Sequence, residues 1–264
     1  MRPSLVDKMK QNLIHETAAR PAVRHDKKRV AAKQAINAIS LVIILLLVLG
    51  NSLTKAVADA PPSAPEILDR VRLQQSQQQL DLQGQLRTGA TVIPFRMTQT
   101  GPVIRYTFAN PPEVLQLRLG EKGSRLDLVT ENSAKKFSAS RLDEKIGGTG
   151  VTYGDLALKF LYWPNAQVIG ADTIRTRDCW KLRLPAPGKD AQYSSVLLWV
   201  DKESGAIMQL EGYDKTGQLA KRFEVVSAQK IGGRWFLKQM RIEELQPGTN
   251  KVLVRTYLEI KKPS

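Results

Sequence analysis

The sequence has 264 residues, of which 40 are Lys or Arg and 25 are Asp or Glu, so its formal net charge is +15. A hydrophobic fraction of 42% and a charged fraction of 25% are typical of a globular protein, and they exclude a wholly disordered or collagen-like chain. The single cysteine, Cys179, excludes an internal disulfide, a cysteine-rich zinc site and a CxxC redox pair.

The chain begins with a basic region that is followed by an apolar run. Residues 1–38 contain nine Lys or Arg and three Asp or Glu, and the 21 residues between Lys33 and Lys55 carry no charge. We interpret 1–38 as a cytoplasmic region and 39–58 as either a signal-peptide core or an uncleaved membrane anchor. The small residues Ala56-Val-Ala58 and the Pro-rich break after them favour cleavage, whereas the long basic flank and the near-spanning aliphatic run favour the anchor.

Both interpretations place the chain from Asp59 onward outside the cytoplasm, because a positively charged flank stays on the cytoplasmic side. If the apolar run is not cleaved, residues 39–53 attach the protein to the membrane. Residues 59–264 contain 30 basic and 22 acidic residues, a net charge of +8. Much of the total charge therefore belongs to the targeting region, and we expect no nucleic-acid partner.

The exported part is predicted to consist of a linker, residues 59–65, and one domain, residues 66–264. Apolar residues on one helical face predict an amphipathic helix over Glu66–Leu82. After Gly84 the apolar residues alternate with polar ones and are interrupted by turn signals, which indicates strands. The first predicted strands are Arg105–Phe108, Val114–Leu119 and Arg125–Val129, and Thr152–Trp163 predicts a short helix with Thr152 at or near its N-cap.

Six further strands are predicted in the second half of the domain. They are Arg177–Leu184, Ser194–Val200, Ile207–Tyr213, Lys221–Ser227, Trp235–Leu245 and Val252–Lys261. Short connections favour antiparallel neighbours. Nine or ten such strands with two helical interruptions predict a mainly β (α+β) fold: an unclosed antiparallel β-barrel, or half-barrel meander, with covering helices.

Catalytic chemistry has little support in the exported domain. Both histidines, His15 and His25, precede it, so it lacks a histidine for a catalytic pair or for a zinc site. The motifs GxSxG, GxxxxGK(S/T) and HExxH do not occur. We expect no enzyme activity, no metal site and no cofactor.

Binding of an apolar ligand in the concave face of the curved sheet is the remaining interpretation. The candidate cavity and lid residues are apolar side chains of the short helix and of two strands: Leu156, Phe160, Leu161, Trp163, Leu197, Trp199, Met208 and Leu210. The alternative is that these side chains simply fill a core.

Several stretches carry a resemblance to a known family. They are Asp178–Pro185, Tyr193–Lys202 with the sequence Trp-Val-Asp-Lys, Gly205–Asp214, Gly217 with Lys221, Ile231–Trp235 leading to Met240, and Gly150–Leu156. Together they resemble the LolA-like outer-membrane lipoprotein-sorting protein family, in its branch of uncharacterised secreted proteins. The resemblance covers about residues 148–260 and, more loosely, 64–147.

The resemblance implies an unclosed β-barrel whose apolar cavity receives the acyl chains of lipoproteins or related lipids in the periplasm, without covalent chemistry. It therefore predicts a periplasmic lipid- or lipoprotein-binding protein that acts in lipoprotein sorting or lipid transfer, with inner- or outer-membrane proteins as further partners. A membrane-tethered module that senses lipid or regulates another envelope protein, on the same fold, is the alternative, and a retained segment 39–53 would favour it.

Overall fold

The structure is a computed structural model that describes residues 61–76, 78–131, 133–231 and 234–261. Residues 61–264 form one compact unit, and the following concerns that unit. The predicted cytoplasmic region 1–38, the predicted signal core or anchor 39–58 and the first part of the linker lie outside the described residues. Within the described residues, every helix is too short or too polar to cross a bilayer.

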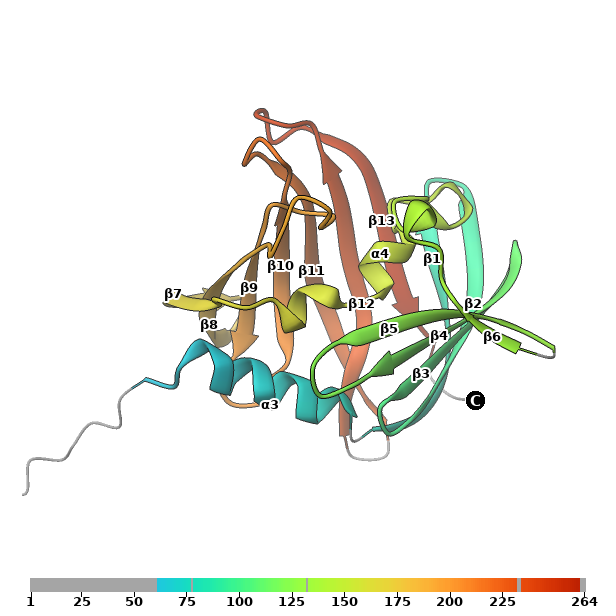
Figure 1. Ribbon diagram of the computed structural model, residues 1–264, viewed down its shortest axis with the longest axis horizontal. Coiled ribbons are helices and arrows are strands. Elements are labelled where there is room, and N and C mark those ends of the chain that lie inside the picture. The colour runs from blue at the N-terminus through green and yellow to red at the C-terminus, as the bar shows by residue number, and fades with distance from the viewer. Residues whose placement is uncertain (1–60, 77, 132, 232–233, 262–264) are drawn as a thin grey trace, which may run out of the picture. The chain divides into compact units, whose positions relative to one another are not determined.

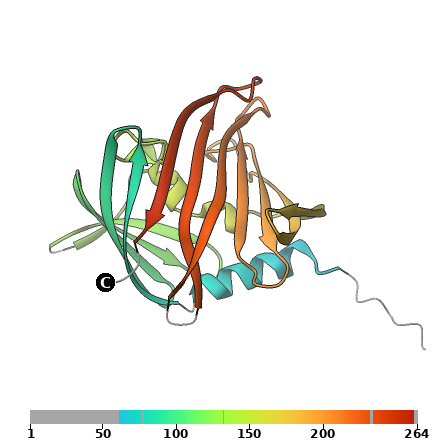
Figure 2. The same ribbon diagram turned by 180° about the vertical axis from the view of Figure 1, so that it is seen from behind.

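In the described part of the chain, thirteen antiparallel strands form one open sheet (Figures 1 and 2), which confirms the predicted half-barrel meander. The strands are β1 (Gln79–Thr88), β2 (Thr91–Thr100), β3 (Val103–Ala109), β4 (Pro112–Leu119), β5 (Ser124–Thr130), β6 (Ser133–Lys136), β7 (Gln167–Ile174), β8 (Arg177–Pro185), β9 (Ser195–Asp201), β10 (Ile207–Tyr213), β11 (Leu219–Ile231), β12 (Arg234–Leu245) and β13 (Val252–Ile260). Their spatial order is β6-β5-β4-β3-β2-β1-β13-β12-β11-β10-β9-β8-β7, so β6 and β7 are the two edges of the sheet.

The first helix is shorter than the sequence pattern predicts. Helix α3 spans Ala64–Ser76, and Leu80 and Leu82 belong to β1 instead. Ser63 caps the helix reciprocally with Glu66, whose carboxylate accepts a 2.7 Å hydrogen bond from the Ser63 N–H. From Leu80 onward the apolar residues recur at every second position, which suits a strand and not a helix.

The 30 residues that join edge strand β6 to edge strand β7 lie across the concave face of the sheet (Figure 1). We call residues 137–166 the covering segment. It contains four short helices, which are η1 (Ala139–Arg141), η2 (Ile146–Gly148), α4 (Tyr153–Leu156) and η3 (Lys159–Tyr162). The single helix predicted over Thr152–Trp163 is therefore two pieces, because Leu158 adopts a left-handed conformation with φ of 51° and breaks the helix.

The two faces of the sheet differ in character. The concave face is apolar and packs against α3 and the covering segment. The convex face carries cross-strand ion pairs, for example Arg255–Glu243 and Arg222–Glu211, each 2.9 Å long. Period-two alternation along each strand separates the two sets of side chains, as expected of a sheet with one face in water.

Candidate functional site

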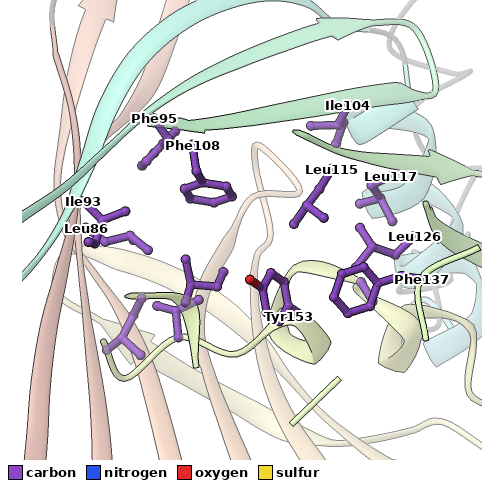
Figure 3. Close-up of a cluster of buried hydrophobic side chains, with 14 of the residues drawn as sticks. Leu86, Ile93, Phe95, Ile104, Phe108, Leu115, Leu117, Leu126, Phe137 and Tyr153 are labelled. Carbon is purple, nitrogen blue, oxygen red and sulfur yellow. The ribbon is translucent and has the colours of Figure 1, made fainter. Parts of the chain in front are cut away.

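The candidate site is the apolar layer between the concave face of the sheet and the elements that cover it. The first apolar cluster lies between strands β1–β5 and the middle of the covering segment. Figure 3 shows Tyr153 and Phe137 of the covering segment facing Phe108, Leu115 and other apolar side chains of the sheet. The Phe137 and Tyr153 rings are 4.6 Å apart between centroids. The covering segment thus packs apolar side chains against the concave face of the sheet.

The second apolar cluster lies under α3 and η3, against strands β8–β10. Its buried side chains are Ala64, Ile67, Leu68 and Val71 of α3, Phe160 and Leu161 of η3, and Leu182, Leu184, Tyr193, Val196, Leu198, Val200 and Leu210 of the sheet or the loop before β9. Leu158 and Phe223 pack against both clusters and so connect them. The two clusters form one continuous apolar layer beneath α3 and the covering segment.

A buried polar group fastens the covering segment to the sheet. Asp155, in the first turn of α4, has a side chain that is 3% exposed, and Lys221 of β11 donates a 2.7 Å hydrogen bond to its Oδ2 atom. Tyr193 and Gln192, in the loop between β8 and β9, donate to Oδ1 over 2.8 and 3.0 Å. We call Asp155, Lys221, Tyr193 and Gln192 the latch.

The latch also depends on local structure around it. Thr152 is the N-cap of α4, as predicted, and its backbone N–H donates to Asp155 Oδ2 over 2.8 Å in a capping box. Gly212 of β10 lets the Tyr193 ring lie directly on the strand, because a Cβ atom there would come within 2.5 Å of the ring. Burial, together with the Asp155 carboxylate, raises the pKa of Tyr193 well above its usual value, so its hydroxyl remains a donor.

A second polar contact ties α4 to the other half of the sheet. The Tyr153 hydroxyl donates a 2.6 Å hydrogen bond to Glu113 of β4, and Arg141 lies over the Tyr153 ring and 3.5 Å from the Glu113 carboxylate. Burial raises the pKa of Tyr153 to about 12, and the bond to Glu113 adds to the effect. Helix α4 is therefore held from both sides of the concave face.

The closed arrangement leaves two unfavourable features in and beside η3. Leu158 has a positive φ, which costs a residue other than glycine about 1 kcal/mol or more. The Tyr162 hydroxyl is buried and has no hydrogen-bond partner among the described residues, and a buried unsatisfied hydroxyl costs roughly 1–3 kcal/mol. Both costs would be relieved if this part of the covering segment moved.

The structure brings together only part of the residue set proposed from the sequence. Phe160, Leu161, Trp163 and Leu210 gather in or against the second apolar cluster, and Leu156 packs against the first. Leu197 and Trp199 lie on the opposite, convex face, because Val196, Leu198 and Val200 point inward. Met208 is the extra residue of a bulge between Ile207 and Gln209, and it belongs to neither cluster.

Trp199 has polar neighbours that suit the convex face. Its indole N–H donates to Asp172 over 3.1 Å, and Lys181 lies 4.7 Å from the ring centroid. The expectation that Leu197 and Trp199 face the same cavity as Leu210 is therefore corrected by the register of β9. The cavity-facing residues of this strand are Val196, Leu198 and Val200.

Sequence reasoning did not assign a role to the latch. The part of the latch that the sequence indicates is the capping-box spacing Thr152-x-x-Asp155. Lys221 lies 66 residues away from Asp155 in the sequence and contacts it only in the folded chain. In the parts of the chain that the structure describes, no three His, Cys, Asp or Glu side chains gather closely enough to bind a metal ion.

Comparisons with known proteins agree with this architecture. A family model described as "Uncharacterized protein" matches residues 130–264, and no curated protein matches the sequence. Among solved structures, the chain resembles one from Vibrio parahaemolyticus that is provisionally described as an outer membrane lipoprotein-sorting protein domain. The TM-score is 0.58 at 15% identity, over 75% of this chain and 90% of that one. A LolA superfamily protein from Nitrosomonas europaea gives a TM-score of 0.54 at 16% identity, over 76% and 93%. At these identities the similarity concerns the fold.

Proposed function

The chain belongs to the family described as "Uncharacterized protein" and has the fold of the LolA superfamily, and from this premise we propose that it is a non-catalytic lipid- or lipoprotein-binding protein of the periplasm. One observation carries the proposal: a continuous apolar layer lies between an open sheet and short elements that could separate from it. An acyl chain would take the place of the covering side chains in that layer.

The covering segment has the properties that a removable cover needs. It consists of helices of three or four residues, which are too short to be stable by themselves, so its order depends on packing and on the latch. The strain at Leu158 and the unpaired Tyr162 hydroxyl favour an open form by a few kcal/mol at most, against the latch and apolar burial that favour the closed form. An acyl chain that buries the exposed apolar layer would shift this balance.

We propose two groups of ligand-facing side chains. The first group, already predicted from the sequence, is Leu156, Phe160, Leu161, Trp163 and Leu210, and the second, added by the register of β9, is Val196, Leu198 and Val200. We also propose that lipoprotein acyl chains or related lipids are the ligand, and that sorting or transfer of lipoproteins is the process served. The LolA-like fold and the predicted export of residues 59–264 support both.

Native mass spectrometry of residues 59–264, expressed with export and purified without detergent, tests the proposal. We expect co-purified species of lipid mass, and we expect Leu198→Asp to remove them while Leu197→Asp, on the convex face, retains them. An empty protein that also fails to take up a fluorescent fatty-acyl probe would refute lipid binding. Circular dichroism of both variants checks that each one folds.

A second candidate is a membrane-tethered module that senses lipid or binds an envelope protein on the same fold. The uncharged 21-residue run before Lys55 favours it, because a retained run of this length can span a bilayer. Cell fractionation distinguishes the two: a carrier is recovered in the soluble periplasmic fraction and passes lipid to an acceptor, whereas a tethered module remains in the membrane fraction.

A further inference from the structure

A cleft opens beside helix α3, at the end of the second apolar cluster. It has a volume of about 300 Å³ and lies between α3, strands β8 and β9, and the turn that follows β9. Its lining residues are Ile67, Arg70, Leu73, Gln74, Trp180, Val200, Asp201, Lys202, Glu203, Ser204 and Gly205. No part of the latch contributes to it.

The floor of the cleft is continuous with the apolar layer. Ile67 and Val200 are 3% and 1% exposed and belong to the second apolar cluster, and Trp180 packs against the same cluster. At the rim, Leu73 is 56% exposed, although it is a large apolar side chain on a helix. A chain that enters here would therefore pass from an apolar rim directly beneath α3.

The lining of the cleft contains two cations and two carboxylates, and these differ in whether they already have salt-bridge partners. Arg70 and Lys202 are both exposed, and neither forms a salt bridge among the described residues, whereas the two acidic lining residues, Asp201 and Glu203, are both paired with Arg177. The Lys202 ammonium group lies 4.3 Å from the centroid of the Trp180 ring, which holds this cation over the cleft. Two cations are thus available to a ligand, and the carboxylates are engaged elsewhere.

We propose that this cleft binds the anionic head group of an amphiphile, a phosphate or a carboxylate, while its hydrocarbon chain continues under α3 into the second apolar cluster. The inference rests on the proposed lipid-binding function and adds the chemical class of the ligand. A volume of 300 Å³ equals about ten water molecules, which suits a head group and the first part of a chain and not a whole lipid. Arg70 and Lys202 supply the positive charge, and Trp180 lies between the charged mouth and the apolar floor, a position that tryptophan favours.

The test measures how well three compounds displace a fluorescent acyl probe from the full chain, exported by its host and then purified. The compounds are dodecyl phosphate, dodecanol and inorganic phosphate. We expect dodecyl phosphate to bind at least tenfold more tightly than dodecanol, and inorganic phosphate to compete only at far higher concentration. The double variant Arg70→Gln/Lys202→Gln is expected to lose the tenfold preference and to bind dodecanol as the native chain does.

The matched control is Lys135→Gln/Lys251→Gln, which removes the same charge from two exposed lysines outside the cleft that form no salt bridge among the described residues. It is expected to keep the preference. Equal binding of dodecyl phosphate and dodecanol, or loss of the preference in this control, would overturn the head-group site and leave lipid binding intact. Tight binding of inorganic phosphate alone would instead identify a free-anion site. Failure of both dodecyl compounds to bind would refute the proposed function itself.

Discussion

Replacing Asp155 by Asn removes the negative charge of the latch and leaves the Lys221 ammonium group inside the protein. The Lys221 side chain is 7% exposed, and its hydrogen bond to Asp155 is the one that the structure gives it. The ammonium group would then be buried without its salt-bridge partner, because Glu244, its cross-strand neighbour on β12, is already paired with Lys145. Removing one partner of a buried ion pair is among the most destabilising changes a single substitution can make. We therefore expect Asp155→Asn to release the covering segment.

The size of the effect follows from the geometry. At 2.7 Å and an effective dielectric constant of about 20, the attraction between the two charges is about 6 kcal/mol before any desolvation cost. After that cost, removing one partner of such a pair destabilises a protein by about 3–5 kcal/mol. A change of 3 kcal/mol raises the population of the released form about a hundredfold.

Hydrogen exchange measured by mass spectrometry can follow this release. Amides of residues 152–161 are expected to exchange about a hundredfold faster in Asp155→Asn, and adding Lys221→Met should restore most of their protection because the unpaired charge is gone. The matched control is Asp201→Asn, since its carboxylate is equally buried and paired, but with Arg177 on the convex face. It should lower the free energy of unfolding without selective exchange in residues 152–161. Unchanged exchange in Asp155→Asn would refute the role of the latch.

Three further outcomes are expected. Gly147→Ala should destabilise the fold by about 1–2 kcal/mol more than Gly148→Ala in urea unfolding, because only the former brings a Cβ atom within 2.6 Å of Ile93; equal losses would contradict this. The pKa of Tyr153 is raised to about 12 in the folded protein, so its contribution to the free energy of unfolding should be complete below pH 10 and be lost as the pH rises from 10 toward 12. The free energy of unfolding of Tyr153→Phe should therefore fall less steeply than that of the native chain over this pH range. Cys179 is fully buried, and burial raises the pKa of its thiol, so a thiol reagent should react only after unfolding; rapid native labelling would contradict its position.

Strands that alternate clearly could be predicted from the sequence, and the turns between them contain glycine or proline. All nine strands predicted by name overlap observed strands, and the antiparallel meander follows from their short connections. The observed strands β1, β2, β6 and β7 are not among the nine predicted ones. In β2, Pro94 and the mixed sequence Thr91–Thr100 obscure the alternation. The break at Leu158 could not be predicted either, since leucine rarely adopts a positive φ and tertiary packing imposes it.

The orientation of strand β9 shows why the candidate site could be predicted only in part. Residues Val196–Val200 are all apolar, so a period of two cannot tell which side chains point toward the concave face. The neighbouring strands and α3 decide it, and they place Leu198 inward and Leu197 outward. The latch depends on the same long-range information, because Asp155 and Lys221 become neighbours only when β11 lies beneath α4.

Photo-crosslinking in living cells is the sharpest test of whether a lipid chain occupies the apolar layer, because it applies whether or not the N-terminal segment is retained. Cells that express the full chain are supplied with a photoactivatable fatty acid and then irradiated. The crosslinked peptides of the protein are identified by mass spectrometry. We expect crosslinks to Phe160, Leu161 and Leu198 of the apolar layer and none to Leu197 on the convex face. Crosslinks confined to the convex face, or no crosslinks to the apolar layer, would contradict this expectation.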